Sequence, residues 1–194
     1  MDYFVGGIAG IFEVAVTHPI DLLKNRSQVH NTVKFSPYAG IKPKLISVVP
    51  IRMVFWGSTY GLKDRYSPVI VGSIAGFSQT LIETPAEVLK MRQSLKTNQP
   101  LWAGFGWHAV RNMGFAACVV ASIPYSAAPI GALVGCIITH PLDTLKTASQ
   151  TGLPSKPVWS GLGFRSLQSM IAMSVGQGTF FVYGYIENLI KISY

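Results

Sequence analysis

Long apolar stretches dominate the pattern of this chain, and its charges gather at their ends. Tyr3–Pro19 contains one acid, Glu13; Ser67–Thr84 contains one, Glu83; and 112–139 contains no charged residue. Stretches of this length are typical of helices that cross a membrane. The pattern predicts six spans, at about 3–24, 41–63, 69–92, 105–123, 127–146 and 162–190.

The apolar stretch 112–139 is too long for one span. Pro124 and Pro129 bracket Tyr125–Ala128, which predicts a tight turn between the fourth and fifth spans. A single long, kinked helix is the alternative, and it would give five spans. The threefold repeat favours the turn, because each apolar run that ends in the repeated proline needs its own partner helix.

One phrase ends the first, third and fifth stretches: a proline, an acid two residues later and a lysine three residues after that. An aromatic residue, a small residue and glycine then follow. The copies are Pro19, Asp21 and Lys24 with Tyr38–Gly40; Pro85, Glu87 and Lys90 with Trp102–Gly104; and Pro141, Asp143 and Lys146 with Trp159–Gly161. An internal repeat predicts an architecture of like units.

We therefore expect one transmembrane domain, 1–194, with repeats at about 1–65, 66–125 and 126–194. The fold class is an all-α membrane protein, with six transmembrane helices in three pseudo-threefold two-helix repeats around a central cavity. Small residues four apart in each odd span, such as Gly72 and Gly76, favour close packing of these helices in lipid.

The repeated phrase places opposite charges at membrane depth on a bent helix. Proline removes one backbone hydrogen bond, and residues three apart share one helical face. Charges at this depth are costly unless they pair or line a water-filled cavity. Each acid can pair with the lysine of its own helix or with that of a neighbouring repeat. Three copies in register favour the second arrangement, a closed ring at one end of the cavity.

Composition supports a membrane protein and gives little support to other classes. The chain is 49% hydrophobic and 12% charged, with a mean hydropathy of +0.36, whereas soluble domains carry about 25% charged residues. Of 16 Lys and Arg residues, 11 lie at or near the connections after odd spans, which places those connections on the inner side. We expect anionic lipid headgroups, such as those of cardiolipin, as partners, and no nucleic acid.

Enzyme chemistry has no recognisable motif in this sequence. It contains no Gly-x-Ser-x-Gly, no phosphate-binding glycine loop and no Cys/His ligand cluster. Cys118 and Cys136 lie within apolar runs without metal-ligand spacing, so we expect no metal and no cofactor. His18 and His140 precede the repeated prolines, and His30 is expected to be solvated.

The even spans carry polar residues at two fixed distances from the repeated glycine. Positions four and seven residues later share one helical face, which we expect to line the cavity. The alternative is that these side chains extend outward to the headgroups, which suits Lys44 best. An arginine fork binds carboxylates or phosphates, so an anionic solute is favoured, although Glu13 and Glu83 leave a zwitterion open. The two sets are Lys44, His108 and Arg165, and Ser47, Arg111 and Gln168.

The repeated phrase resembles the signature of the mitochondrial carrier family: proline, acid, basic, a second basic residue and a glutamine at fixed spacing. The stretch Pro19–Gln28 matches fully, the second copy has Gln93 one place early, and the third has Ala148 for the second basic residue. The resemblance implies a carrier that exchanges a solute across an organellar inner membrane by alternating access.

By this resemblance, particular residues have particular roles. The helix kinks are Pro19, Pro85 and Pro141; a matrix-side gate consists of Asp21, Lys24, Glu87, Lys90, Asp143 and Lys146; and Gln28 and Gln150 brace this gate. The family's substrate contacts match Ser47, Arg111 with Asn112, and Gln168, a pattern closer to carboxylate and keto-acid carriers than to adenine nucleotide carriers. A nucleotide or S-adenosylmethionine carrier, and a degenerate carrier without transport, are the alternatives.

The resemblance also implies a place for the protein and shows where the chain departs from the family. We expect a monomer in the mitochondrial inner membrane, with a relict mitochondrion-derived organelle or a plastid envelope as the alternative. Only nine residues separate Gln28 from Tyr38, so the matrix-side surface helices are expected to be mostly missing. The opposite gate keeps Tyr60 and Lys63 without the acid, which predicts a bias toward closure on the inner side. A channel and a membrane scaffold are competing functions.

Overall fold

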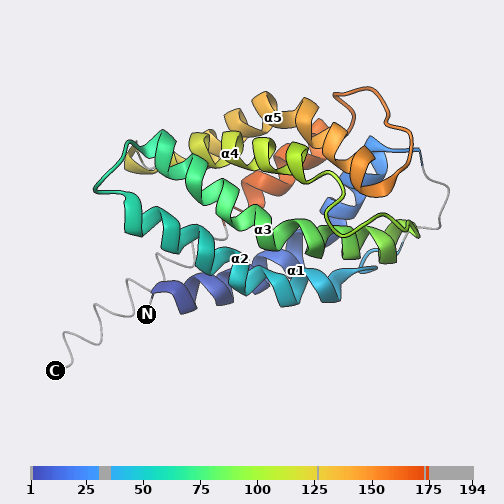
Figure 1. Ribbon diagram of the computed structural model, residues 1–194, viewed down its shortest axis with the longest axis horizontal. Helices are drawn as coiled ribbons and strands as arrows, with labels where there is room; N and C mark the ends of the chain where they lie inside the picture. Colours follow the sequence, from blue (N-terminus) through green and yellow to red (C-terminus); the bar gives the residue numbers. More distant parts are fainter. Residues whose placement is uncertain (1, 31–35, 126, 173, 175–194) are drawn as a thin grey trace.

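Helices make up most of the computed structural model, which describes residues 2–30, 36–125, 127–172 and 174. The helices in chain order are α1 (Asp2–Gln28), α2 (Ile41–Leu62), α3 (Pro68–Leu95), α4 (Phe105–Ser122), a short 3-10 turn η1 (Ile123–Tyr125) and α5 (Ala128–Thr151), as Figure 1 shows. Residues 162–172 form a further helical segment. The predicted all-α fold with six helices is confirmed. The rest of the sixth predicted span lies outside the described residues.

The predicted turn between the fourth and fifth spans is present. The helix α4 ends at Ser122, and α5 begins at Ala128 after the short turn η1. The two helices then pack against each other along their length. The alternative of one long, kinked helix is therefore wrong, because Pro124 and Pro129 separate two helices instead of bending one.

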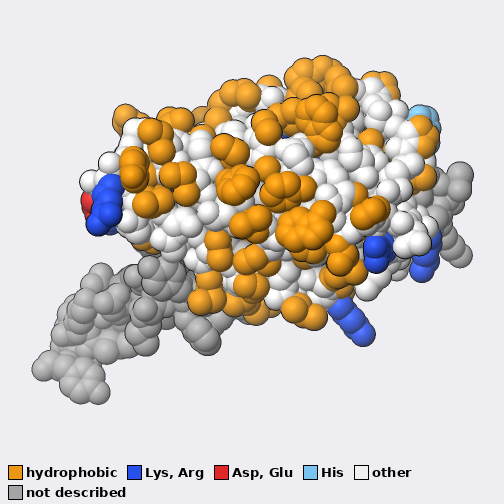
Figure 2. Space-filling model, viewed as in Figure 1, with side chains coloured by type: hydrophobic (Ala, Val, Ile, Leu, Met, Phe, Trp, Pro, Cys, Tyr) orange, Lys and Arg blue, Asp and Glu red, His pale blue; other side chains and the backbone are white. Residues whose placement is uncertain are grey.

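The surface of the bundle fits an apolar surrounding. Figure 2 shows hydrophobic side chains over the middle of one face, whereas the Lys and Arg side chains lie toward the two ends of the long axis. Among the described helices, α2 and α5 are long and apolar enough by composition to cross a membrane. The helices α1 and α3 are more polar because, besides the acid and lysine of the repeated phrase that α5 also carries, they contain Glu13 and Arg26 or Glu83 and Arg92.

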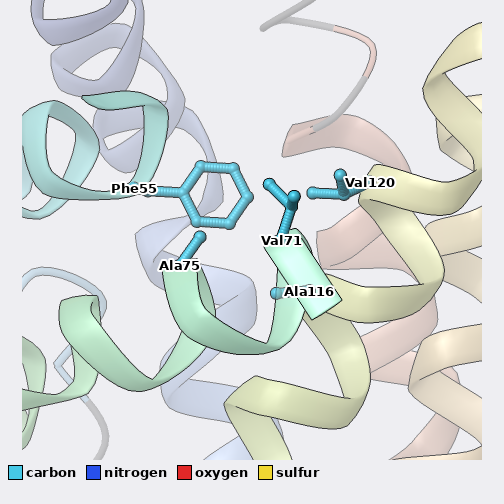
Figure 3. Close-up of a cluster of buried hydrophobic side chains, with 5 residues drawn as sticks. All are labelled: Phe55, Val71, Ala75, Ala116 and Val120. Atoms are coloured by element: carbon cyan, nitrogen blue, oxygen red, sulfur yellow. The ribbon is translucent and has the colours of Figure 1, made fainter. Parts of the chain in front are cut away.

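Close contacts between backbones hold neighbouring helices together. A Cβ on Gly72 would lie 2.5 Å from the carbonyl oxygen of Ala116, and one on Gly76 would clash with the backbone of Asn112, so α3 and α4 approach closely only because these residues are glycines. An apolar cluster joins α2 to this pair, with Phe55, Val71, Ala75, Ala116 and Val120 pointing toward one another (Figure 3).

The repeated glycine has the same backbone role in all three repeats. Gly40, Gly104 and Gly161 have φ angles of 76°, 69° and 84°, in the left-handed region that favours glycine. Each begins an even helix. A Cβ on Gly40 would lie 2.7 Å from the carbonyl oxygen of Lys90, and Gly104 and Gly161 lie in the same way against the carbonyls of Lys146 and Lys24. The three turns therefore seat each even helix against the lysine of another repeat.

The connections after the odd helices are short. Their described residues contain turns and an isolated bridge between Val29 and Ser155, and no helix. The amide of Lys156 donates to the carbonyl of Gln28 at 2.9 Å, which ties the third connection to the end of α1. Pro19, Pro85 and Pro141 lie inside α1, α3 and α5, as their predicted role as kinks requires.

Candidate functional site

Six charged residues from the repeated phrase meet at one end of the bundle. The Lys90 Nζ lies 2.7 Å from Asp21 Oδ2, and the Lys24 Nζ lies 2.7 Å from Asp143 Oδ2. Lys146 forms an ion pair with Glu87. All six side chains are buried. Each acid therefore contacts the lysine of another repeat, and we call this set of three pairs the charge ring.

Pairing within a single helix is weaker in this structure. Among the described residues, the ion pair within one copy of the phrase joins Lys90 to Glu87 at 3.7 Å, which is 1.0 Å longer than the Lys90–Asp21 pair. Coulomb attraction falls with distance, so the contacts between repeats dominate. The role of the ring as a gate stays a prediction.

The two predicted braces differ in their surroundings. The Gln28 amide donates to Asp143 Oδ2 at 2.8 Å and accepts from the Thr147 hydroxyl at 2.7 Å, so Gln28 supports the Lys24–Asp143 pair directly. Gln150 is also fully buried, but its side-chain atoms have no hydrogen-bond partner within the described part of the chain. The structure therefore brings one of the two glutamines into contact with the ring.

A cavity opens next to the charge ring and is bounded by α1, α2, α3, α4 and the segment 162–172. Its volume is about 130 Å³. It combines ring residues with further charges and a few apolar side chains. The polar residues of its lining are Glu13, Thr17, His18, Asp21, Lys24, Lys44, Arg52, Gln79, Glu83, Glu87, Arg111, Gln168 and Ser169.

The predicted solute contacts divide into two groups. Lys44, Arg111 and Gln168 line the cavity. Four others lie outside its described lining, at contacts between helices or against their own helix: Ser47, His108, Asn112 and Arg165.

Hydrogen bonds explain why these four side chains do not face the cavity. His108 is bonded to the Thr84 hydroxyl on α3 at 2.9 Å, and Arg165 donates to the Thr139 hydroxyl on α5. Asn112 donates to Thr80 and Glu83 on α3, and the hydroxyl of Ser47 donates to the carbonyl of Lys44. The shared spacing predicted one polar face. Hydrogen bonds to the neighbouring helix hold His108, Asn112 and Arg165 between helices, whereas Ser47 is bonded to its own helix.

Several cavity residues come from the odd helices. The sequence analysis counted positions from the repeated glycine along the even helices only, so it did not identify these residues. Glu13 forms an ion pair with Arg52 on α2. Glu83 lies 3.5 Å from Lys44 Nζ and 3.4 Å from His108 Nε2. The signal for both acids was present in the sequence, because each is the one charged residue in a long apolar run, where an unpaired charge is costly.

Two histidines connect the repeated proline with the repeated turn. The Nε2 of His18 lies 3.2 Å from the carbonyl oxygen of Ala39, and that of His140 lies 3.1 Å from the carbonyl oxygen of Ser160. Their rings stack on Tyr38 and Trp159, at interplanar angles of 9° and 17°. Sequence reasoning assigned these histidines no role beyond preceding the prolines. The structure shows that they fasten an odd helix to the start of the next even helix.

The described residues contain no group of three or more His, Cys, Asp or Glu side chains arranged to hold a metal ion. The lining of the cavity offers charged and polar groups to a solute. His30 is exposed, as expected.

The comparisons with known proteins agree with this architecture. Residues 1–38 match the family model described as "Mitochondrial carrier protein". The chain is 24% identical over 227 aligned positions to a calcium-binding mitochondrial carrier protein of Dictyostelium discoideum, covering 92% of this chain and 29% of that protein.

Two further relatives show the same resemblance over most of the chain. The chain is 26% identical to a probable chloroplastic S-adenosylmethionine carrier of Arabidopsis thaliana, covering 73% of this chain and 56% of that protein. It is also 26% identical to a probable mitochondrial 2-oxodicarboxylate carrier of Schizosaccharomyces pombe, covering 77% and 73%. The chain thus spans little more than half, or less, of the first two relatives.

The length of one alignment shows that this chain is shorter than the part of the relative that it matches. The 227 aligned positions in the Dictyostelium protein exceed the 194 residues of this chain, so that relative carries segments that this chain lacks. This agrees with the short connections after the odd helices. The threefold phrase, the helical architecture and the matches to carriers together support membership of this chain in the mitochondrial carrier family.

Proposed function

We propose that the protein exchanges a small carboxylate metabolite across an organellar inner membrane by alternating access. The observation that carries the proposal is a cavity that borders the buried charge ring through Asp21, Lys24 and Glu87 and whose lining also includes Arg111 and Lys44. A guanidinium and an ammonium group at the same cavity are the donors that bind carboxylates best.

The size of the cavity supports a small solute. Its volume of about 130 Å³, as bounded by the described residues, lies below the roughly 300–1,000 Å³ of pockets that hold drug-sized ligands. A keto acid or a dicarboxylate fits such a space better than a nucleotide does. Two relatives have names that fit this range: a 2-oxodicarboxylate carrier and an aspartate-glutamate transporter.

The charge ring supports alternating access because it closes the cavity with breakable contacts. Secondary transporters open one side of a central site while the other stays closed. We propose that Asp21, Lys24, Glu87, Lys90, Asp143 and Lys146 form the inner gate, and that Gln28 braces it. Solute contacts with Arg111, Lys44 and Gln168 then offset part of the cost of breaking the three pairs.

A zwitterionic solute is the second candidate, because Glu13 and Glu83 also line the cavity. An amino acid or S-adenosylmethionine would place its cationic group near these acids and its carboxylate near Arg111. A carrier that has lost transport is the remaining alternative. We further propose that the protein acts as a monomer in the mitochondrial inner membrane, in contact with anionic lipids.

Exchange across reconstituted liposomes tests the proposal. Liposomes preloaded with unlabelled dicarboxylates, keto acids, amino acids, nucleotides or S-adenosylmethionine are assayed for uptake of the labelled compound. We expect saturable exchange of a carboxylate, and at least a tenfold loss of it in Arg111→Ala. Arg65→Ala, at an exposed position, is the matched control and should keep the wild-type rate. Full carboxylate exchange in Arg111→Ala would contradict the proposal, and no exchange of any compound by the wild type would favour a degenerate carrier.

A further inference from the structure

The charged residues of the ring and those paired with them fall into two groups that differ in net charge. The first group contains three acids, Asp21, Glu83 and Glu87, and three lysines, Lys44, Lys90 and Lys146, joined by ion pairs. With His108 neutral, its net charge is zero. We call it the balanced cluster.

The second group surrounds a single acid. Lys24 Nζ lies 2.7 Å from Asp143 Oδ2, Arg111 Nε lies 3.2 Å from Asp143 Oδ1, and Arg165 Nε lies 4.0 Å from Asp143 Oδ2. Three cations and one carboxylate give this group, the Asp143 cluster, a net charge of +2 among the described residues.

Burial makes this excess charge costly. The side chains of Lys24, Arg111 and Arg165 are 5%, 15% and 1% exposed. The Nε and Nη1 atoms of Arg165 have no hydrogen-bond partner in the described part of the chain, although the same guanidinium donates to Thr139. Buried cations without matching anions are destabilising, so the closed form of this site favours an added negative charge.

The position of the cluster shows where such an anion can bind. Lys24 and Arg111 line the cavity, whereas Arg165 lies behind them, outside the cavity lining. An anion on the cavity floor can therefore contact Lys24 and Arg111 directly. The anion would also be attracted to the buried charge of Arg165, because little water screens that charge.

We propose that the Asp143 cluster is an anion subsite that selects a doubly charged dicarboxylate solute, with Arg165 as a buried residue that sets this charge preference. The inference rests on the proposed function and narrows it to a substrate class. A dianion brings the cluster to zero net charge, a monocarboxylate leaves +1 and a zwitterion leaves +2. The balanced cluster has no net positive charge for an anion to neutralise.

The test measures thermal unfolding of the purified full chain at constant ionic strength. The probes are straight-chain dicarboxylates of three to six carbons and their monomethyl esters, which have one charge fewer at nearly the same size. We expect at least one dicarboxylate to raise the unfolding temperature with an apparent affinity about tenfold or more above that of its ester. Equal stabilisation by a dicarboxylate and its ester would overturn the inference.

A matched pair of variants isolates the charge of Arg165. Arg165→Gln removes the charge and retains a donor for Thr139, whereas Arg165→Lys retains the charge. We expect the glutamine variant to bind the dicarboxylate about tenfold more weakly and to prefer it less over the ester, while its unfolding temperature without solute does not fall. The lysine variant should keep the preference. The same preference in both variants would show that Arg165 only packs the helices.

The outcomes separate this inference from the proposed function. If the wild type exchanges no carboxylate in liposomes, the proposed function fails. If it exchanges monocarboxylates or zwitterions as well as dicarboxylates, the proposed function holds and the dianion inference fails. Should Arg165→Gln not fold, the comparison of dicarboxylate with ester in the wild type still decides the inference.

Discussion

The two ends of the helical bundle differ in how they hold the repeats together. At the end that holds the charge ring, which we predict to be the inner end, three buried ion pairs join one repeat to another, and Gln28 supports one of them. At the opposite end, Lys63, which follows the last residue of α2, lies over the ring of Tyr60, 5.5 Å from its centroid, and both residues are exposed. No ion pair between repeats involves the turns at that end in the described part of the chain.

Under the proposed function, this difference predicts which contacts keep the cavity closed. Buried charge pairs between repeats hold separate helices together. Exposed contacts within one repeat do not join it to the other repeats. A two-state carrier is biased toward the state that its stronger gate closes. The comparison therefore predicts that changes at the inner end have large effects and that changes at the opposite end have small ones.

The largest effect is expected from removing one partner of a ring pair. Lys90→Met leaves Asp21 buried without its lysine, which should lower the free energy of unfolding by about 3–5 kcal/mol. Thermal or chemical unfolding of the purified protein measures this change. The double variant Asp21→Leu with Lys90→Met removes both charges and should recover most of the loss. A double variant no more stable than Lys90→Met would show that the pair is not the cause.

A smaller effect separates the two glutamines of the inner end. Gln28→Met removes a hydrogen bond to the charged Asp143 and should lower the free energy of unfolding by about 1.5–3 kcal/mol. Gln150→Met replaces a buried amide that has no hydrogen-bond partner among the described residues, so it should be neutral or stabilising. The same unfolding assay compares the two variants. Equal losses would show that Gln150 also supports the ring.

The smallest effect is expected at the opposite end. Lys63→Ala removes an exposed contact with Tyr60 and should change the free energy of unfolding by about 0.5–1 kcal/mol or less. It should leave the exchange rate in liposomes unchanged. A loss as large as that of Lys90→Met would mean that this end closes the cavity too, and the contrast between the two ends would disappear.

Much of the fold could be predicted because its signals are local. The apolar runs set the helices to within a few residues of their observed bounds, and Pro124 with Pro129 marked the turn before α5. The repeated glycines followed from backbone geometry, since only glycine adopts the left-handed φ freely. Hydropathy marks α1 and α3 less clearly than α2 and α5. The reason is again physical, because α1 and α3 carry charged residues that point into the bundle.

The cavity could be predicted only in part. The spacing of the even helices identified Lys44, Arg111 and Gln168, but it also included His108 and Arg165, which hydrogen bonds hold between helices. The count from the repeated glycine did not reach Arg52 or the acids of the odd helices. Spacing gives the face of a helix, whereas the partner on the neighbouring helix decides where a long side chain ends.

The sequence by itself determined the number of helices, the threefold repeat and the three acids and three lysines that needed partners. It determined these because periodicity and the cost of charges in an apolar run are properties of each segment. Only the tertiary structure decided that each acid meets the lysine of another repeat and that Asp143 collects three cations while the other acids stay balanced. Such pairing depends on which helices lie side by side, and no single segment contains that information.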